Sequence, residues 1–332
     1  MTKDVANALS TGRRLIHRSV GIPDSRDFRG QTCGTVVAME PILRGDALTT
    51  GLSDAEIRRA LRNGELERLE PGVYIADASL DDLDRYRMRV RSVGARLSDD
   101  TVISHESAAV LHGLALWKPD LARVHVTRDR SAGGRRTASR HLHVAPLPTC
   151  DRSEVDGVPC TSMARTVVDL ACTLDFDAAV IAGDSAGSRE PEFAEALTRC
   201  LAESGPRTGI AAARRVAAFV DGRSESPGES LSRVRMQEVG MPSPILQQEI
   251  RTPGGLFVGR ADFYWEDEGV VGEFDGMGKY DDGGIEAVRR EKRREDALRD
   301  LGFEVVRWTW PELFRFDVVR ARFDRAVARA RR

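Results

Sequence analysis

The sequence predicts an α+β multidomain protein with three folded parts: a winged helix-turn-helix, an α+β middle domain and a C-terminal domain of order αβββαβα. The length of 332 residues exceeds what one small core needs and suggests two or three domains, at roughly 100 to 200 residues each. Hydrophobic residues make up 41% and charged residues 31%, which is typical of a globular protein. Helical and alternating apolar periods then succeed one another along the chain.

The composition argues against membrane insertion and secretion. No run of about 18 apolar residues is present, which is what a bilayer span requires. The first residues, MTKDVANALSTGRRLIHRS, lack the apolar core and cleavage site of a secretory signal. We therefore expect a cytoplasmic protein without a membrane partner.

Cysteine, histidine and net charge limit the chemistry. The 5 cysteines are scattered, without a CxxC pair or a histidine at zinc spacing, so neither disulfides nor structural zinc are expected. All 6 histidines lie in the first half, so catalysis in the second half would have to use carboxylates, lysine or a metal. The net charge of -2 means that nucleic-acid binding must come from local basic patches.

Residues 1–38 mix Gly, Ser, Arg and Asp without a sustained period. We expect a disordered tail or a misassigned start site.

Residues 39–80 have the pattern of a winged helix-turn-helix. A short helical stretch, EPILRGDAL, is followed by a turn and then by a helix in which Ser53 and Glu56 form a capping box. Ile57 and Leu61 mark the apolar side of this helix, and LERLEPGVYIA has the form of a hairpin wing. Three arginines project from the other side and are the expected DNA-binding residues: Arg58, Arg59 and Arg62. The alternative is a small structural module whose arginine face is merely solvated.

This segment resembles the N-terminal winged helix of AbiEi-like antitoxins, and GLSDAEIRRALRNGELERLEPGVY carries the resemblance. The resemblance implies DNA as a partner. It leaves open whether the chain also binds a cognate toxin or associates with itself.

Residues 81–222 form the α+β middle domain, for which the sequence gives no role. His105 and His112 could share a helix face, but no acidic or cysteine partner stands at ligand spacing, so we expect packing or hydrogen bonding. The segment is similar to the region that follows the winged helix in AbiEi-like proteins, which implies no active site. DGRSESPG, residues 221–228, is typical of a linker followed by a helix start.

Residues 223–332 predict the order αβββαβα. The first helix is SPGESLSRVRMQEVG, and the three strands that follow are PILQQEIRT, LFVGRADFYW and GVVGEFD. GIEAVRREKRREDALRDLG is a long helix, FEVVRWTW a fourth strand and PELFRFDVVRARFDRAVARA the closing helix.

A hairpin turn at EDEG sets the register of the second and third strands. It pairs Trp265 with Val270 and therefore places Asp262 opposite Glu273. Two carboxylates facing each other repel and are destabilising, so such a pair, with a perturbed pKa or a bound cation, is a candidate for function. Oxygen ligands suit Mg²⁺ or Mn²⁺. The same register places Asp275 opposite Arg260, so Asp275 belongs either to a cross-strand ion pair or to the metal site.

The C-terminal part resembles PD-(D/E)XK nuclease-like domains related to very-short-patch repair (Vsr) endonucleases, which have a restriction-endonuclease-like fold. The residues that carry this are SPGES, GRADFYW, VVGEFDGMGKY and EKRREDALRDLGFEVVRWTW. The resemblance implies that Asp262 and Glu273 bind the metal and that Glu229 is a supporting catalytic acid. Ser226 and Glu229 also fit a capping box, so Glu229 could be purely structural.

The sequence departs from the nuclease motif where the motif requires lysine, because Asp275 stands at that position. The amine that positions water and phosphate would have to come from elsewhere. Lys279 is the preferred substitute and Lys292 the second.

The main hypothesis is a Mg²⁺-dependent endonuclease that hydrolyses DNA phosphodiester bonds and is targeted by the winged helix. The alternative is a DNA-binding, antitoxin-like transcriptional regulator in which the nuclease fold is inactive. A third interpretation is a protein-interaction scaffold.

Overall fold

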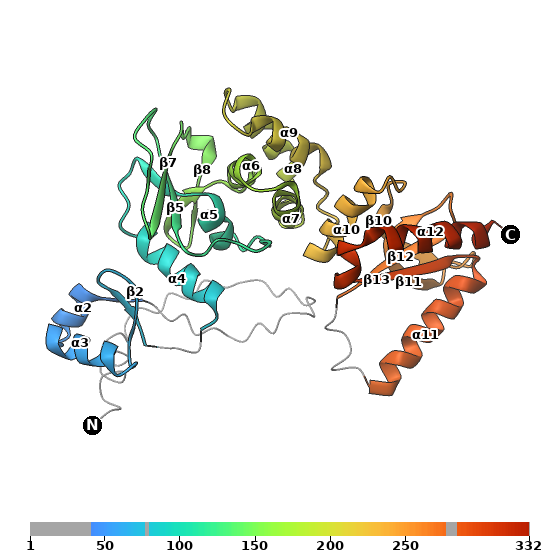
Figure 1. The fold of residues 1–332 in the computed structure, drawn as a ribbon, viewed down its shortest axis with the longest axis horizontal. Helices are drawn as coiled ribbons and strands as arrows, with labels where there is room; N and C mark the ends of the chain where they lie inside the picture. Colours follow the sequence, from blue (N-terminus) through green and yellow to red (C-terminus); the bar gives the residue numbers. More distant parts are fainter. Residues whose placement is uncertain (1–40, 77–79, 277–283, 332) are drawn as a thin grey trace. The chain divides into compact units, whose positions relative to one another are not determined.

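The computed structural model describes residues 41–76, 80–276 and 284–331, with side chains of 284–291 excepted. The predicted tail, 1–38, lies outside these residues. The chain divides into two compact units, and each is described by itself. Unit 1 comprises Met1–Ile103, Leu121–Pro146 and Glu154–Cys160, and unit 2 comprises Ser104–Asp120, Leu147–Ser153 and Thr161–Arg332. Most elements of both are labelled in Figure 1.

Unit 1 begins with the predicted helix, turn, helix and hairpin. The elements are β1 (Ile42–Leu43), α2 (Arg44–Thr49), α3 (Asp54–Arg62), β2 (Glu67–Glu70) and β3 (Val73–Ile75). The three strands form an antiparallel sheet in the order β1-β3-β2. The two helices and this sheet bury a small apolar core: Ala47, Ile57, Ala60, Leu66 and Tyr74.

The wing is tied to the helix that follows it, α4 (Asp82–Gly94). Arg89 Nε of α4 donates to Glu70 Oε1 at 2.5 Å, and the Glu70 side chain is buried. Arg85 of α4 pairs with Glu67 at 3.1 Å. These contacts fix the hairpin against a helix, which an isolated two-stranded wing would lack.

A mixed six-stranded sheet has the order β6-β7-β5-β4-β9-β8. Its strands are β4 (Thr101–Ile103), β5 (Val124–Arg128), β6 (Arg135–Arg136), β7 (Arg140–Val144), β8 (Arg152–Val155) and β9 (Val158–Thr161). The pairs β5–β7 and β4–β9 are parallel, whereas β4–β5 and β6–β7 are antiparallel.

The first half of unit 2 is helical. It contains α5 (His105–Leu111), η1 (Thr149–Asp151), α6 (Met163–Thr173), α7 (Phe176–Gly187), α8 (Phe193–Glu203) and α9 (Ile210–Phe219). These helices share one apolar core rich in alanine and valine. Arg165, itself buried, is paired with Asp151 at 2.5 Å and with Asp169 at 2.9 Å, so its charge is compensated inside this core.

The second half of unit 2 has the element order that the sequence predicts, with one added 3-10 turn. The elements are α10 (Pro227–Glu238), β10 (Ile245–Arg251), β11 (Phe257–Trp265), β12 (Val270–Asp275), α11 (Gly284–Asp300), β13 (Glu304–Thr309), η2 (Trp310–Phe314) and α12 (Phe316–Ala330). The strand order is β10-β11-β12-β13, and only the β12–β13 pair is parallel.

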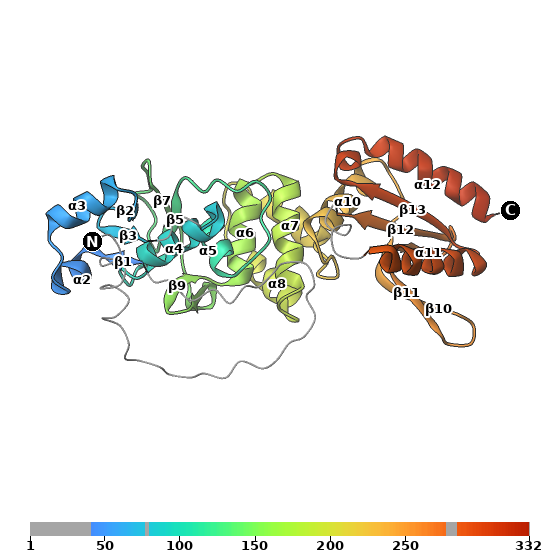
Figure 2. The ribbon, with the colours of Figure 1, turned by 90° about the horizontal axis from the view of Figure 1, so that it is seen from below.

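Helices cover both faces of this sheet, with α12 on one side and α11 on the other (Figure 2). The α10 and α12 side buries the larger core, which includes Phe263, Trp265 and Trp308. The α11 side buries a smaller one around Leu298 and Val271. Strand β12 is therefore covered on both faces, which explains its nearly continuous burial, whereas β11 keeps an alternating pattern.

The segment predicted to be a linker, 221–228, is hydrogen-bonded into unit 2. The backbone N–H of Asp221 donates to Asp184 Oδ1 of α7 at 2.8 Å, and Arg233 of α10 donates to Asp184 Oδ2 at 2.7 Å. Asp184 thus joins α7 to the start of the sheet domain.

Within the described residues, no helix combines the length and the apolar character needed to cross a membrane.

Gly228, in the first turn of α10, allows the helix to approach β12 closely. A Cβ at this position would lie 1.9 Å from Cε1 of Phe274, which real structures do not tolerate. We expect Gly228→Ala to lower the free energy of unfolding by about 1–3 kcal/mol, despite the better helix propensity of alanine. Gly45→Ala is the matched control, because nothing lies within 4 Å of its Cβ position. Thermal unfolding of both variants measures the difference, and equal midpoints would contradict the close packing of α10 on β12.

Candidate nucleic-acid interface and carboxylate cluster

Helix α3 is closed at its start by the predicted capping box. The N–H of Glu56 donates to Ser53 Oγ at 3.3 Å, and the N–H of Ser53 donates to Glu56 Oε2 at 2.8 Å. The backbone amides of Ser53 and Glu56 are thereby satisfied. The capping box fixes where the helix begins and hence which residues lie on each side.

The two sides of α3 differ in burial as the sequence predicts. Ile57 and Ala60 are each 3% exposed and pack into the small core of this segment, whereas Leu61, the other residue predicted for the apolar side, is partly buried against that core. The other side carries three exposed arginines: Arg58, Arg59 and Arg62. In the part of the chain that the structure describes, these three guanidiniums form no ion pair. They are thus available to phosphates or base edges.

The two acidic residues in the first turn of α3 are engaged by neighbouring side chains and backbone. Asp54 accepts from Arg44 Nε at 2.8 Å and from Arg44 Nη2 at 2.5 Å, and this hydrogen bonding lowers the pKa of Asp54. Glu56 is held by Ser53, which lowers the pKa of Glu56. Arg68 on β2 is a further exposed arginine that the sequence analysis did not select. Its place on the wing could have been recognised from the alternation of ERLE.

Glu273 on β12 lies between two arginines. Arg307 Nε donates to Glu273 Oε2 at 2.8 Å, and Arg294 Nη2 of α11 donates to Glu273 Oε1. Arg307 is also paired with Glu295 at 2.5 Å. Glu273 is only 8% exposed, so this network compensates a buried charge.

The predicted register of β11 and β12 is observed at its start, with Trp265 paired to Val270 and Phe263 to Gly272. At the next position the Asp262 carboxylate accepts from the backbone N–H of Phe274 at 3.0 Å. Of the two alternatives for Asp275, an ion pair with Arg260 and a place in the metal site, the first is not formed: Arg260 pairs with Glu225 at 2.6 Å.

Glu229 on α10 is buried and makes several hydrogen bonds. Its N–H donates to Ser226 Oγ at 3.2 Å, which is one half of the predicted capping box; the reciprocal bond to the Glu229 carboxylate comes from the N–H of Glu225 and not from that of Ser226. Its carboxylate accepts from the N–H of Glu225 at 2.9 Å, Ser226 Oγ at 2.8 Å and Gln247 Nε2 at 2.9 Å. Burial is the main cause that raises the pKa of Glu229.

Gln247 was not selected from the sequence. It stands in β10 with a positive φ of 53°, and its side-chain Oε1 is buried without a hydrogen-bond partner. A glutamine in a predicted strand gives no indication in the sequence that its side chain contacts a buried carboxylate. Gln247 therefore adds an amide oxygen that could bind a metal beside Glu229.

These residues can be compared with the needs of Mg²⁺, which binds carboxylate and carbonyl oxygens. Glu229 and Asp262 offer suitable atoms, and Gln247 adds one. Glu273, however, is engaged by two guanidiniums through both oxygens, so the set in this arrangement does not fit a metal site centred on Glu273. Of the predicted amines, Lys292 is exposed on α11, and Lys279 lies outside the described residues.

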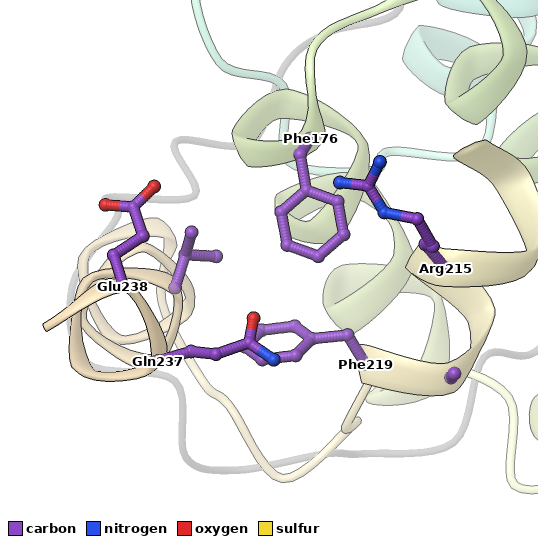
Figure 3. Close-up of a pocket in the computed structure, with 7 residues that line it drawn as sticks. Phe176, Arg215, Phe219, Gln237 and Glu238 are labelled. Carbon is purple, nitrogen blue, oxygen red and sulfur yellow. The ribbon is translucent and has the colours of Figure 1, made fainter. Parts of the chain in front are cut away.

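A separate hollow in unit 2 lies between α7, α9 and α10 (Figure 3). Phe176 and Phe219 line it, and the guanidinium of Arg215 lies 5.4 Å from the Phe176 ring centroid. Its carboxylate, Glu238, is paired with Arg235 at 2.7 Å. This hollow offers no acid–base or nucleophilic set for chemistry.

The N-terminal segment matches a known protein family. Residues 39–76 match the family described as "Transcriptional regulator, AbiEi antitoxin". This span contains β1 to β3 and the three arginines of α3. The predicted AbiEi-like resemblance of this segment is thereby confirmed.

Over most of its length the chain is similar to proteins of Mycobacterium tuberculosis. The crystal structure of RV2827C protein has 15% sequence identity and a TM-score of 0.38, and covers 66% of this chain and 86% of that one. Uncharacterized protein Rv2248 (strain H37Rv) and Uncharacterized protein MT2308 (strain CDC 1551) are each 30% identical over 246 residues, 74% of this chain and 86% of theirs. The chain therefore belongs to the same protein family as Rv2248 and MT2308 of Mycobacterium tuberculosis.

Proposed function

We propose that this protein is a DNA-binding transcriptional regulator of the AbiEi antitoxin type, with α3 as the helix that enters the major groove. The exposed side of α3 carries the proposal: Arg58, Arg59 and Arg62 stand together on a capped helix whose other side is buried. The match of this segment to an antitoxin regulator family supports the proposal.

The chemistry of the three arginines suits DNA. A guanidinium can neutralise a phosphate or donate two hydrogen bonds to the O6 and N7 atoms of guanine. The chain has a net charge of -2, so its global field does not favour DNA. Affinity must therefore depend on this local patch, and Arg68 on the wing extends it.

The second candidate function is a Mg²⁺-dependent endonuclease in residues 223–332. The element order αβββαβα supports it, together with Glu229, Asp262 and the unpartnered oxygen of Gln247. The two arginines on Glu273 oppose it, because the carboxylate would have to exchange two charge-assisted hydrogen bonds for a metal. In the regulator, Glu273 holds α11 and β13 together.

A plasmid assay separates the two functions. As a regulator, the purified full-length protein should leave supercoiled DNA intact with Mg²⁺ or Mn²⁺ while still retarding it in a gel. Cleavage that EDTA stops, and that Asp262→Asn or Glu273→Gln abolishes, would establish the endonuclease. Lys279→Ala and Lys292→Ala would then show which amine assists, since loss of a transition-state donor slows turnover by roughly 10²-fold or more.

The antitoxin description also supports a protein partner. A cognate toxin and a second copy of the chain remain the alternatives, and light scattering of the purified protein distinguishes self-association from a monomer that awaits a partner.

A further inference from the structure

Three histidines meet on one face of the parallel pair β5–β7 in unit 1. The register places His125 opposite His141 and Thr127 opposite His143. Because side chains of a strand alternate between faces, these four residues share one face of the ladder. We call this set, His125, Thr127, His141 and His143, the histidine face.

The imidazoles are close together. His125 Nδ1 lies 3.1 Å from His143 Nε2. The ring centroids of His141 and His143 are 3.8 Å apart, and the His125 ring lies 5.2 Å from each of the other two. All three side chains are half-buried.

The spacing of the two facing nitrogens is close to that of ligands on a shared ion. Two nitrogens bound to tetrahedral Zn²⁺ at about 2.0–2.1 Å lie roughly 3.3 Å apart. An imidazole–imidazole hydrogen bond would give a similar distance. The choice between them depends on what else this face offers.

Thr127 supplies the second observation. It is 1% exposed, and its Oγ1 has no hydrogen-bond partner. A buried hydroxyl without a partner is unfavourable, and such groups commonly contact a bound ion or its water. Thr127 is the register partner of His143, so its hydroxyl belongs to the same face.

We propose that the histidine face binds a divalent transition-metal cation such as Zn²⁺, with His125 and His143 as ligands and water completing the coordination. Imidazole nitrogen suits zinc, copper and nickel. Arg123 and Arg136 place positive charge near His141, so His141 is assigned to packing on His143 rather than to ligation. The cation would link β5 to β7 within the unit that carries the winged helix.

Sequence spacing hides this site. Its histidines come from two strands that are separated by a connection and by β6, and neither strand contains a zinc motif. The expectation that the chain has no structural zinc rested only on the spacing of cysteines and histidines along the sequence.

The test uses full-length protein stripped with EDTA and titrated with Zn²⁺ in competition with a chromophoric chelator. We expect saturable binding of one Zn²⁺, weakened at least tenfold by His125→Gln and by His143→Ala. His141→Gln should change the affinity less than about threefold. His17→Gln removes an imidazole elsewhere in the chain and should have no effect. Circular dichroism of the apo variants establishes that they remain folded.

A second measurement needs no variant. Histidine nitrogen NMR of the wild type should show Zn²⁺ shifting the resonances of His125 Nδ1 and His143 Nε2, and Co²⁺ should produce a visible absorption band. Absence of saturable Zn²⁺ binding would overturn the proposal, and so would unchanged affinity in both ligand variants. In either case the 3.1 Å contact is a hydrogen bond alone.

Discussion

Replacing Arg58, Arg59 and Arg62 together by alanine should weaken DNA binding by roughly 10³-fold or more, because each charge-assisted hydrogen bond to DNA contributes about 1.5 kcal/mol or more. The slope of log K against log salt should become shallower by about three if all three arginines contact phosphates. Fluorescence anisotropy with a labelled duplex at several salt concentrations measures both quantities.

The control removes the same charge from other exposed helical arginines, namely Arg199, Arg214 and Arg325. This variant should retain wild-type affinity and slope to within experimental error. If the α3 variant behaves like the control, α3 is a structural helix and the DNA-binding surface lies elsewhere. In the proposed arrangement, replacing an arginine that reads guanine should weaken binding and also relax the sequence preference. If α3 is structural, single substitutions should change neither.

Glu273→Ala should lower the free energy of unfolding of unit 2 by about 3 kcal/mol, because the change leaves two partly buried guanidiniums without their shared partner. Arg294 and Arg307 are 24% and 33% exposed, so the estimate is at the lower end of the range for broken buried pairs. Urea denaturation followed by tryptophan fluorescence is suitable, since Trp265 and Trp308 lie in this core.

Glu249→Ala serves as the matched control for that substitution. Glu249 pairs with Arg251 on β10, and both side chains are more than half exposed, 56% and 52%. Its loss should cost less than about 0.5 kcal/mol. Equal stability of the Glu273 and Glu249 variants would mean that the two arginines do not depend on Glu273, and the endonuclease hypothesis would gain support.

Local signals in the sequence were sufficient for the helices α2 and α3, for the hairpin after them, and for the order of the C-terminal elements. The Ser53–Glu56 capping box and the alternation of burial along α3 both follow from contacts within one helical turn. The EDEG turn likewise fixed the pairing of Trp265 with Val270. Such features depend on residues close in sequence, which is why they could be predicted.

The environment of Glu273 could not be predicted in the same way. The hairpin turn determines only how β12 pairs with β11. The other neighbour of β12 is β13, and Arg307 of β13 is the direct register partner of Glu273. Arg294 reaches the same carboxylate from α11. Both contacts require the parallel crossover, which no local pattern determines.

The middle of the chain shows the same limit. His112 forms the hydrogen bond expected of a packed histidine, since its Nε2 lies 2.8 Å from the Thr161 carbonyl oxygen. The histidine face escaped detection because it depends on the pairing of β5 with β7. Its residues are ordinary strand positions until the sheet brings them together.

We propose that this chain binds DNA through α3 without cutting it. The most direct measurement is equilibrium binding of the full-length protein to a pool of random-sequence duplexes between about 50 and 200 mM salt, with EDTA or Mg²⁺ present, followed by sequencing of the bound fraction. We expect salt-dependent binding that EDTA does not alter, intact DNA in both conditions, and an enriched sequence that the triple α3 variant no longer selects. Undiminished selection by the triple variant, or DNA cut only in Mg²⁺, would contradict it.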